Sequence, residues 1–362
     1  MTTAMYSNSS LDGLDEFNTT IEPPALCERN FGVTVDTIIN FQNQADAILL
    51  VCTILSAFLQ VYVMVVAVKH IRRKTSDKCM HVFLFSMTFA DFLLTALCYP
   101  VELAPRATGF FSHVPRLLNQ TMHISTWVAL IASSSSLVFL NVDKLFYFRF
   151  PLRYGETFTR ARAIILITAS WVFSLLFVCF AWYTESFECV DDDCNTLAIF
   201  EKKTHIYAIF MIVVGVIPTL TCLVVSIYIM KIVSQHRKQL AEERALCATT
   251  TQSRSNSVFV TRMRTFYFIF MTTVFTAITL LPYRLVGMVR SINPGRSHDC
   301  ATIFVFWIMM YMIYLNSIIN PLLTVTVLPQ YRVELTRTFF FRNSDPYKQK
   351  NGATTLTAAT DL

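Results

Sequence analysis

Adjacent residues of opposite charge, Asp143 and Lys144, stand near one end of the third long apolar stretch of this chain. The segment Pro151-Leu152-Arg153-Tyr154 begins eight residues after Asp143. Charges inside lipid-compatible sequence are costly, so they mark function more often than they occur without a role. The pair and its surroundings therefore predict a conformational switch that faces the cytoplasm.

A second set of polar residues lies within the apolar stretches. Asp91 is the one acid in the second stretch, and Asn316 and Asn320 in the last stretch are four residues apart, so they share a helical face. Pro321 removes a backbone donor beside them and frees a carbonyl. A buried carboxylate facing amides and hydroxyls suits a hydrated cation, because hard cations take oxygen ligands. A plain hydrogen-bond cluster between membrane helices explains the same residues equally well.

The composition indicates that these polar residues lie in membrane-spanning segments. The 362 residues are 54% hydrophobic and only 15% charged, and the mean hydropathy is +0.48. A soluble domain carries about 25% charged residues, so the chain belongs in a membrane. Windows of about 20 residues predict seven spans. They cover residues 46–68, 80–101, 118–142, 163–184, 205–230, 265–289 and 301–327.

These lengths favour helices over barrel strands, which would alternate with a period of two. We therefore expect an all-α membrane protein, a seven-transmembrane helix bundle with a short amphipathic C-terminal helix. The predicted divisions are an extracellular tail (1–45), the transmembrane domain (46–328), a surface helix (329–342) and a cytoplasmic tail (343–362). Tyr331, Leu335 and Phe339, four residues apart, give the surface helix its apolar stripe.

The charge distribution sets the expected orientation. Five basic residues lie in the 69–78 loop and four in the 149–162 loop, whereas the N-terminal tail up to Asp46 has one Arg against seven acids. We expect the protein in the plasma membrane. The positive-inside rule then puts the N-terminus outside the cell and the C-terminus in the cytoplasm. Glycosylation sequons at Asn8 and Asn18 agree. The net charge of +6 averages two unlike faces and does not indicate nucleic-acid binding.

Ten cysteines are present, and the ones in predicted outer segments can be oxidised. Four outer cysteines allow three pairings, among which sequence cannot choose. These disulfide candidates are Cys27, Cys189, Cys194 and Cys300.

Taken in order along the seven spans, these landmarks resemble those of the rhodopsin-like (class A) G-protein-coupled receptors over about residues 46–342. The matching positions are Asp91, Asp143-Lys144 with Pro151-Leu152-Arg153-Tyr154, Trp171, Pro218, Pro282 and Asn316-Ser317-x-x-Asn320-Pro321. The resemblance implies a receptor that passes ligand binding to heterotrimeric G proteins, with no required cofactor. It also implies an inhibitory sodium pocket at the positions of Asp91, Ser133, Asn316, Ser317 and Asn320. The coupling switch would involve Asp143, Lys144, Pro151, Leu152, Pro282 and Pro321.

The chain departs from the family's pattern where the active state is normally stabilised. Lys144 replaces the usual Arg, which keeps the charge but loses the planar five-donor fork. The other departures are Ser226 and Thr324 for tyrosines, Leu280 for a tryptophan, and Asn119 for the cysteine that ties down the second outer loop. These changes leave open an atypical receptor that does not couple or that favours arrestin, and also a chemosensory receptor.

The expected ligand is a peptide, as in a neuropeptide receptor, because the outer segments are acidic and would steer cationic ligands. Amines and retinal are disfavoured, since residues 117–140 lack a carboxylate and residues 301–327 lack a lysine. Arg284 needs Glu102 or an acidic ligand group as partner, unless it reaches outward to the surface. The candidate ligand-binding residues are Glu102, Thr126, Trp127, Tyr207, Tyr283, Arg284, Tyr311 and Tyr314.

Two further cytoplasmic features were considered. The 231–264 loop offers serines and threonines whose phosphorylation could recruit a partner such as arrestin. The ending Thr360-Asp361-Leu362 fits a PDZ-domain ligand.

The alternative from another class, a secondary transporter, would predict inverted repeats and Gly-interrupted helices, and the chain has only eight glycines. No enzyme motif is present, so we expect no catalysis.

Overall fold

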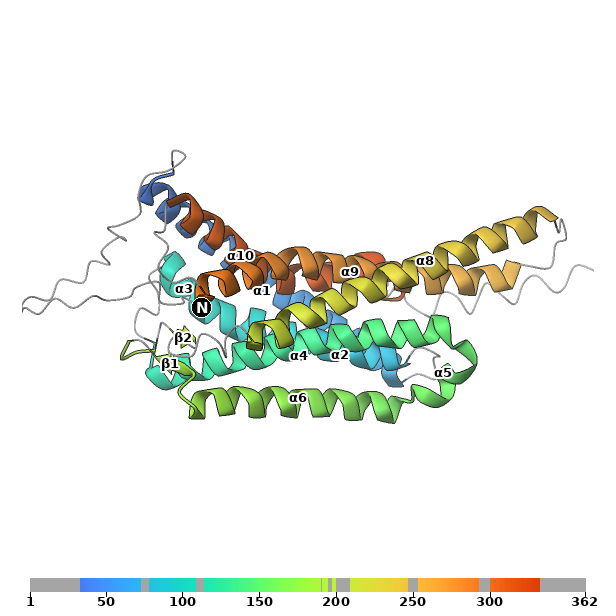
Figure 1. The fold of residues 1–362 in the computed structure, drawn as a ribbon, viewed down its shortest axis with the longest axis horizontal. Helices are drawn as coiled ribbons and strands as arrows, with labels where there is room; N and C mark the ends of the chain where they lie inside the picture. The colour runs from blue at the N-terminus through green and yellow to red at the C-terminus, as the bar shows by residue number, and fades with distance from the viewer. Residues whose placement is uncertain are drawn as a thin grey trace, which may run out of the picture.

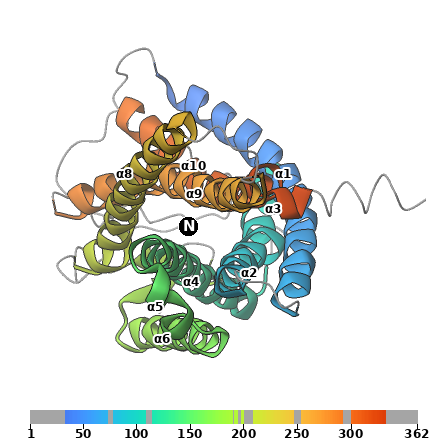
Figure 2. The same ribbon diagram turned by 90° about the vertical axis from the view of Figure 1, so that its right-hand side faces the viewer.

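The structure is a computed structural model that describes residues 33–72, 78–108, 114–189, 191–194, 197–199, 209–246, 253–292 and 300–332. Within these ranges seven helical segments are long and apolar enough to cross a membrane. They run side by side along the long axis of the molecule (Figures 1 and 2). The expected seven-helix architecture is confirmed, and the chain is a multi-pass membrane protein.

The spans are not all single uniform helices. The second consists of α2 (Lys78–Leu93), a π-helical turn η1 (Leu94–Cys98) and α3 (Tyr99–Thr108), and the fifth of a π-helical turn η2 (Met211–Val216) followed by α8 (Ile217–Leu246). The remaining spans are α1 (Val35–Arg72), α4 (Arg116–Arg149), α6 (Arg160–Tyr183), α9 (Ser253–Ile292) and α10 (Cys300–Val327). A short helix α5 (Pro151–Thr157) follows α4.

Two predicted boundaries were wrong. α1 begins at Val35, inside the segment expected to be tail, where the Thr34 hydroxyl accepts a hydrogen bond from the Thr37 backbone N–H at 3.3 Å. The loop expected over 231–264 is largely helical, because α8 continues to Leu246 and α9 starts at Ser253. Hydropathy windows detect only the lipid-crossing part of a helix. The polar extensions contain no Gly or Pro, so nothing stops the helices at the membrane boundary.

The loop after α6 forms a β-hairpin that the all-α prediction did not include; this end of the bundle is called outer, and the opposite end inner, after the predicted orientation. β1 (Phe187–Cys189) pairs antiparallel with β2 (Leu197–Ile199), with Cys189 opposite Leu197. A disulfide joins Cys189 to Cys194. Cys300 is also disulfide-bonded, and Cys27 lies outside the described residues.

Hydrogen bonds hold this loop to the start of α4, where the family normally has a cysteine. The Asn119 side-chain amide donates to the Asp193 carbonyl at 2.9 Å, and His123 Nε2 donates to the Cys194 carbonyl at 3.0 Å. The outer loop is thus closed by its own disulfide and tethered to α4 without a covalent link.

The packed interior divides into an inner and an outer part. Phe83, Leu84 and Leu140 belong to one cluster, whereas Leu94, Leu103 and Met310 belong to another nearer the outer end. Many large apolar side chains point outward instead, as expected for helices in contact with lipid.

The predicted surface helix is described only in its first turn, residues 329–332, after a break at Leu328. Tyr331 is fully buried there, its carbonyl accepts a hydrogen bond from the Tyr62 hydroxyl at 2.7 Å, and its own hydroxyl lies 3.0 Å from His81 Nδ1. Burial raises the pKa of the Tyr331 phenol, so it stays protonated as a donor. Leu335 and Phe339 lie outside the described residues.

Candidate functional site

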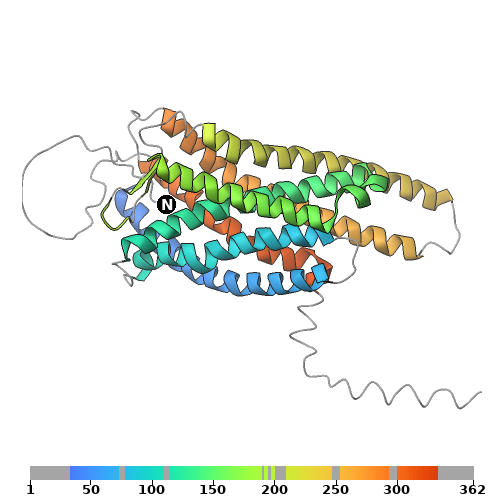
Figure 3. The ribbon, with the colours of Figure 1, turned by 90° about the horizontal axis from the view of Figure 1, so that it is seen from below.

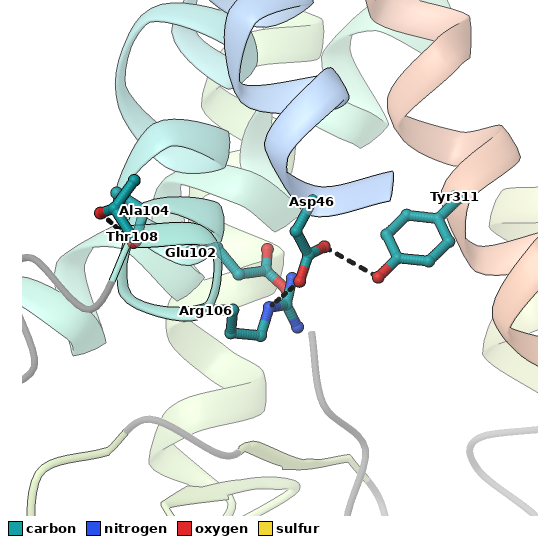
Figure 4. Close-up of polar contacts among 6 residues, drawn as sticks. All are labelled: Asp46, Glu102, Ala104, Arg106, Thr108 and Tyr311. Carbon is teal, nitrogen blue, oxygen red and sulfur yellow. Dashed lines mark hydrogen bonds and ion pairs between the residues drawn. The ribbon is translucent and has the colours of Figure 1, made fainter. Parts of the chain in front are cut away.

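Four side chains from three helices meet at the outer end of the bundle (Figure 4). Arg106 Nε of α3 lies 3.1 Å from Asp46 Oδ2 of α1, and Arg106 Nη2 lies 3.8 Å from Glu102 Oε1. The Tyr311 hydroxyl of α10 donates to Asp46 Oδ1 at 2.8 Å. We call Asp46, Glu102, Arg106 and Tyr311 the outer charged cluster.

The sequence places these groups together through helical spacing. Glu102 and Arg106 are four residues apart and share a face of α3. The last turn of α3 ends with the Thr108 hydroxyl donating to the Ala104 carbonyl at 2.8 Å (Figure 4). Asp46 is only 1% exposed, so its carboxylate needs the guanidinium and the phenol as partners. Two carboxylates therefore lie against one guanidinium.

Sequence reasoning named Glu102 and Tyr311 but missed Asp46 and Arg106. Asp46 was counted among the acids of the tail, although it stands at the start of an apolar run. Arg106 was overlooked although it follows Glu102 by four residues. The sequence did contain a signal for this contact, namely an acid and a base at the ends of two neighbouring apolar spans.

A cavity of about 40 Å³ lies deeper, between α4, η2, α9 and α10. It has room for a few water molecules, since one water needs about 10–15 Å³. Trp127, Tyr283 and Arg284, all candidate ligand residues, line it together with Leu130, Ile131, Ser134, Phe210, Met211, Gly215, Leu280 and Ile313. A larger ligand therefore requires these side chains to rearrange.

Arg284 contacts the π-helical turn rather than Glu102. Its Nη1 donates to the Gly215 carbonyl at 2.7 Å and to the Thr219 hydroxyl at 3.4 Å. A Cβ on Gly215 would lie 2.8 Å from Arg284 Cδ, so a glycine is needed for this close approach. Glu102, one of the alternatives expected for Arg284, lies beside Arg106 on α3 instead.

The candidate ligand residues thus fall into two groups. Glu102, Tyr311 and Tyr314 surround the outer charged cluster, where the Tyr311 and Tyr314 ring centroids are 6.0 Å apart. Trp127, Tyr283 and Arg284 line the deeper cavity. The buried Thr126 hydroxyl donates to the Met122 carbonyl within its own helix, at 2.8 Å. Tyr207 lies outside the described residues.

Asp91 joins three spans in the middle of the bundle. Its Oδ1 accepts from the Ser133 hydroxyl at 3.0 Å, and its Oδ2 accepts from Asn320 Nδ2 at 2.8 Å. Asn316 is directed elsewhere, because its amide donates to Thr276 and Thr279 of α9 at 3.1 and 2.9 Å. Of the two amides expected to face the carboxylate, only Asn320 contacts it.

The groups at Asp91 fit a hard cation. Among the described residues, Asn320 Oδ1 is buried without a hydrogen-bond partner, and it belongs to the side chain that contacts Asp91. A carboxylate, a hydroxyl and an amide oxygen are the donors that such cations take. Ser317 is buried nearby, and its backbone carbonyl accepts from Gln60 Nε2 at 3.0 Å. Gln60, a polar residue inside an apolar span, was missed in the sequence.

At the inner end Asp143 and Lys144 form a sealed ion pair. Lys144 Nζ lies 3.0 Å from Asp143 Oδ2, and the Tyr154 hydroxyl donates to Asp143 Oδ1 at 2.7 Å. Asp143 is 0% exposed and Lys144 4%. Pro151 starts the helix α5 that carries Tyr154, whereas Leu152 is 95% exposed and points away from the bundle.

Beside this pair, the family's missing tyrosine is replaced by a hydrogen-bond chain. The Ser226 hydroxyl of α8 donates to Asn141 Oδ1 at 2.7 Å, and Asn141 Nδ2 donates to the Thr273 hydroxyl of α9 at 3.0 Å. We call Asn141, Ser226 and Thr273 the three-helix polar link. The sequence showed Ser226 only as a lost tyrosine and did not indicate Asn141 as its partner.

The remaining switch positions lie inside the spans. Pro282 is within α9 and Pro321 within α10. The Thr324 hydroxyl donates to the Asn320 carbonyl at 2.9 Å, whereas Leu280 lines the deeper cavity.

Seven spans, a buried acid in the second span bound to an Asn of the seventh, and an inner acid–base pair define a receptor of the rhodopsin type. The family described as "7 transmembrane receptor (rhodopsin family)" matches residues 40–323. The chain belongs to this family of receptors, which is not a family of enzymes or of secondary transporters.

Several named receptors are similar to most of the chain. The G-protein coupled receptor aex-2 of Caenorhabditis elegans is 27% identical over 317 residues, covering 85% of this chain and 87% of that protein. Melatonin receptor type 1B-B of Danio rerio is 22% identical over 263 residues, 71% of each chain. Melatonin receptor type 1C of Xenopus laevis is 21% identical over 299 residues, 81% of this chain and 67% of that receptor.

Proposed function

We propose that this receptor binds a peptide from the extracellular side and activates a heterotrimeric G protein on the cytoplasmic side. The observation that carries the proposal is the placement of two buried acid–base sites at opposite ends of one bundle. The outer charged cluster lies at the end of α3, and the Asp143–Lys144 pair lies beside α5 at the other end (Figure 1). The proposed orientation puts the N-terminus outside, as the loop charges indicate.

The inner pair supplies the proposed switch. Asp143 holds Lys144 by one oxygen and Tyr154 by the other, so a G protein can use Lys144 only after the pair separates. A lysine presents one compact ammonium group instead of a planar fork. We therefore propose that coupling occurs but depends less on this residue than an arginine switch would. Arrestin is a further proposed partner on the same side.

The outer charged cluster supplies the proposed ligand contact. Its two carboxylates, and the exposed Asp192 and Asp193 in the loop between β1 and β2, favour a basic side chain or amino group of a peptide. Glu102 is the proposed anchor, because its side chain is 21% exposed and its carboxylate lies 3.8 Å from the guanidinium. Asp46, which is held at 3.1 Å and buried, is the positioning partner of Arg106.

A sodium ion at Asp91 is the proposed allosteric modulator. The carboxylate, the Ser133 hydroxyl and the Asn320 amide oxygen would hold it, and Ser317 is adjacent in α10. A cation there would tie α2, α4 and α10 together and favour the inactive arrangement. Asn316 would join only after turning from Thr279 of α9.

A small, neutral aromatic ligand is the second candidate. Two of the similar proteins are named as melatonin receptors. The deeper cavity is lined by Trp127, Phe210 and Tyr283, whose rings suit a flat aromatic group. Such a ligand would use Arg284 as its polar contact after the cavity has widened.

A G-protein dissociation assay in cells separates these proposals. A library of basic peptides and a set of small aromatic amides are applied to the wild type and to Lys144→Ala and Lys144→Arg. We expect a response to a peptide, a reduced response in Lys144→Ala, and an increased one in Lys144→Arg. A receptor that is at the cell surface but gives no basal or stimulated signal in all three forms would contradict coupling. Recruitment of arrestin alone would then identify the arrestin-favouring alternative.

A further inference from the structure

A groove at the inner end of α8 and α9 lies outside every site described above. Its volume is about 490 Å³, and it is lined by Ile227, Met230, Lys231, Ser234, Gln235, Lys238 and Phe270. Apart from Phe270 of α9, all lie on α8 at spacings of three or four residues, so they form one helical face. α8 and α9 extend beyond the other helices at this end (Figure 3).

This face of α8 points away from the bundle interior. Ile229 and Val233 are buried against α4 and α9, in a cluster with Phe266. Ile227 is 61% exposed instead, and Lys231 and Lys238 are also exposed. The groove is therefore on the lipid-facing side of the contact between α8 and α9 rather than in the central cavity.

The lining changes from apolar to basic along the helix. Ile227, Met230 and Phe270 lie within the membrane-spanning segments, which end on α8 at Gln235 and begin on α9 at Thr265. Lys231 is one turn before that end, and Lys238 is just beyond it. An apolar floor that leads to two ammonium groups at the membrane boundary matches a molecule with an acyl chain and an anionic head.

We propose that this groove binds an anionic phospholipid of the cytoplasmic leaflet, whose headgroup contacts Lys231 and Lys238 and whose acyl chain lies along Ile227, Met230 and Phe270. The proposal rests on the orientation given under the proposed function, because the cytoplasmic leaflet is the one that carries acidic lipids. A lipid in this position touches α8 and α9 together, one turn from the three-helix polar link, so it would stabilise the packing of these two helices.

The test uses purified full-length receptor in nanodiscs of phosphatidylcholine that contain a photoactivatable phosphatidylserine. Illumination should attach the probe to peptides containing residues 227–238 or Phe270. We expect the double variant Lys231→Gln, Lys238→Gln to reduce this labelling about tenfold, because each surface lysine attracts acidic lipid. Ile227→Trp fills the apolar part and should also reduce labelling while it keeps both charges. The matched control is Arg160→Gln, an exposed basic residue at the start of α6, which should change nothing.

A second readout is thermal stability, which acidic lipid should raise in the wild type and not in the double variant. Equal labelling of wild type and double variant, or equal labelling by a photoactivatable phosphatidylcholine, would overturn the proposal. If the lysine changes weaken G-protein activation without changing labelling, the groove is a protein-docking surface and the lipid proposal is wrong. No G protein is present in the labelling experiment. Failure of the receptor proposal would therefore appear separately, as absent G-protein activation with the lipid labelling intact.

Discussion

The two acid–base sites of this receptor differ in how they are built. The outer charged cluster joins α1, α3 and α10, and its arginine side chain is 28% exposed. The inner pair consists of neighbouring residues on one helix, and both side chains are almost completely buried. A cluster open to solvent can exchange partners with a ligand, whereas a sealed pair can change only when helices move. We propose on this ground that the same chemistry serves recognition at one end and switching at the other.

The largest expected effect comes from breaking the inner pair. Asp143→Asn leaves the Lys144 ammonium buried without its carboxylate, which should lower the stability of the purified receptor by about 3 kcal/mol. It should also raise basal signalling, because Lys144 is no longer held. Thermal unfolding and basal G-protein dissociation measure the two effects. Glu156→Gln, at an exposed position of α5, is the matched control. A stable variant with unchanged basal signal would show that the pair is not a switch.

The outer charged cluster should respond differently at its two acids. Asp46→Asn removes a buried charged partner of Arg106 and should cost about 2 kcal/mol of stability. Glu102→Gln should cost less than about 1 kcal/mol, since this contact is longer and partly exposed. It should instead weaken binding of a basic peptide agonist about tenfold. Unfolding curves and competition binding distinguish the two roles, and equal effects of both variants on affinity would remove the distinction.

The three-helix polar link tests how the inner region holds its helices. Ser226→Ala removes one hydrogen bond between α4 and α8 and should lower stability by about 1 kcal/mol. Thr273→Val breaks the contact from α9 and should do the same. Because both changes cut one chain of bonds, the double variant should cost less than the sum. Strict additivity in thermal unfolding would show that the two bonds act independently.

The smallest effect is expected at the loop tether of the outer region. Asn119→Ala removes the contact to the Asp193 carbonyl and should cost about 1 kcal/mol or less, because this site is partly exposed. The looser loop should speed dissociation of the ligand, as measured by washout binding kinetics. Thr121→Ala is the control, because Thr121 is two residues from Asn119 and its hydroxyl donates within α4 to the Leu117 carbonyl. Unchanged dissociation would mean that the His123 contact and the Cys189–Cys194 disulfide order the loop without Asn119.

Much of the architecture followed from local patterns. Hydropathy predicted the seven spans, and the ordered landmarks within them, such as Pro151 eight residues after Asp143, predicted the receptor family. Such features depend on residues near each other in the chain. The helical extensions of α1, α8 and α9 were missed, because hydropathy does not register a polar helix that leaves the membrane.

The sequence did not predict contacts between residues that are far apart in the chain. For Arg284 the sequence offered Glu102, an acidic ligand group or the outer surface, and gave no sign of the backbone carbonyl that the π-helical turn presents at Gly215. Ser226 was read as a missing tyrosine, but it completes a link to Asn141. In both cases the partner is far away in the sequence and uncharged, so the sequence gives no signal for the contact.

The sequence by itself determined that this chain crosses the membrane seven times and carries the landmarks of a rhodopsin-type receptor, because hydropathy and residue spacing are local properties. That Asp143 and Lys144 form an ion pair was decided by the tertiary structure, because adjacent side chains on a helix do not face each other. Only the tertiary structure decided that Asp46, Glu102, Arg106 and Tyr311 form one cluster. These residues come from α1, α3 and α10, so the contacts form only when the three helices pack side by side.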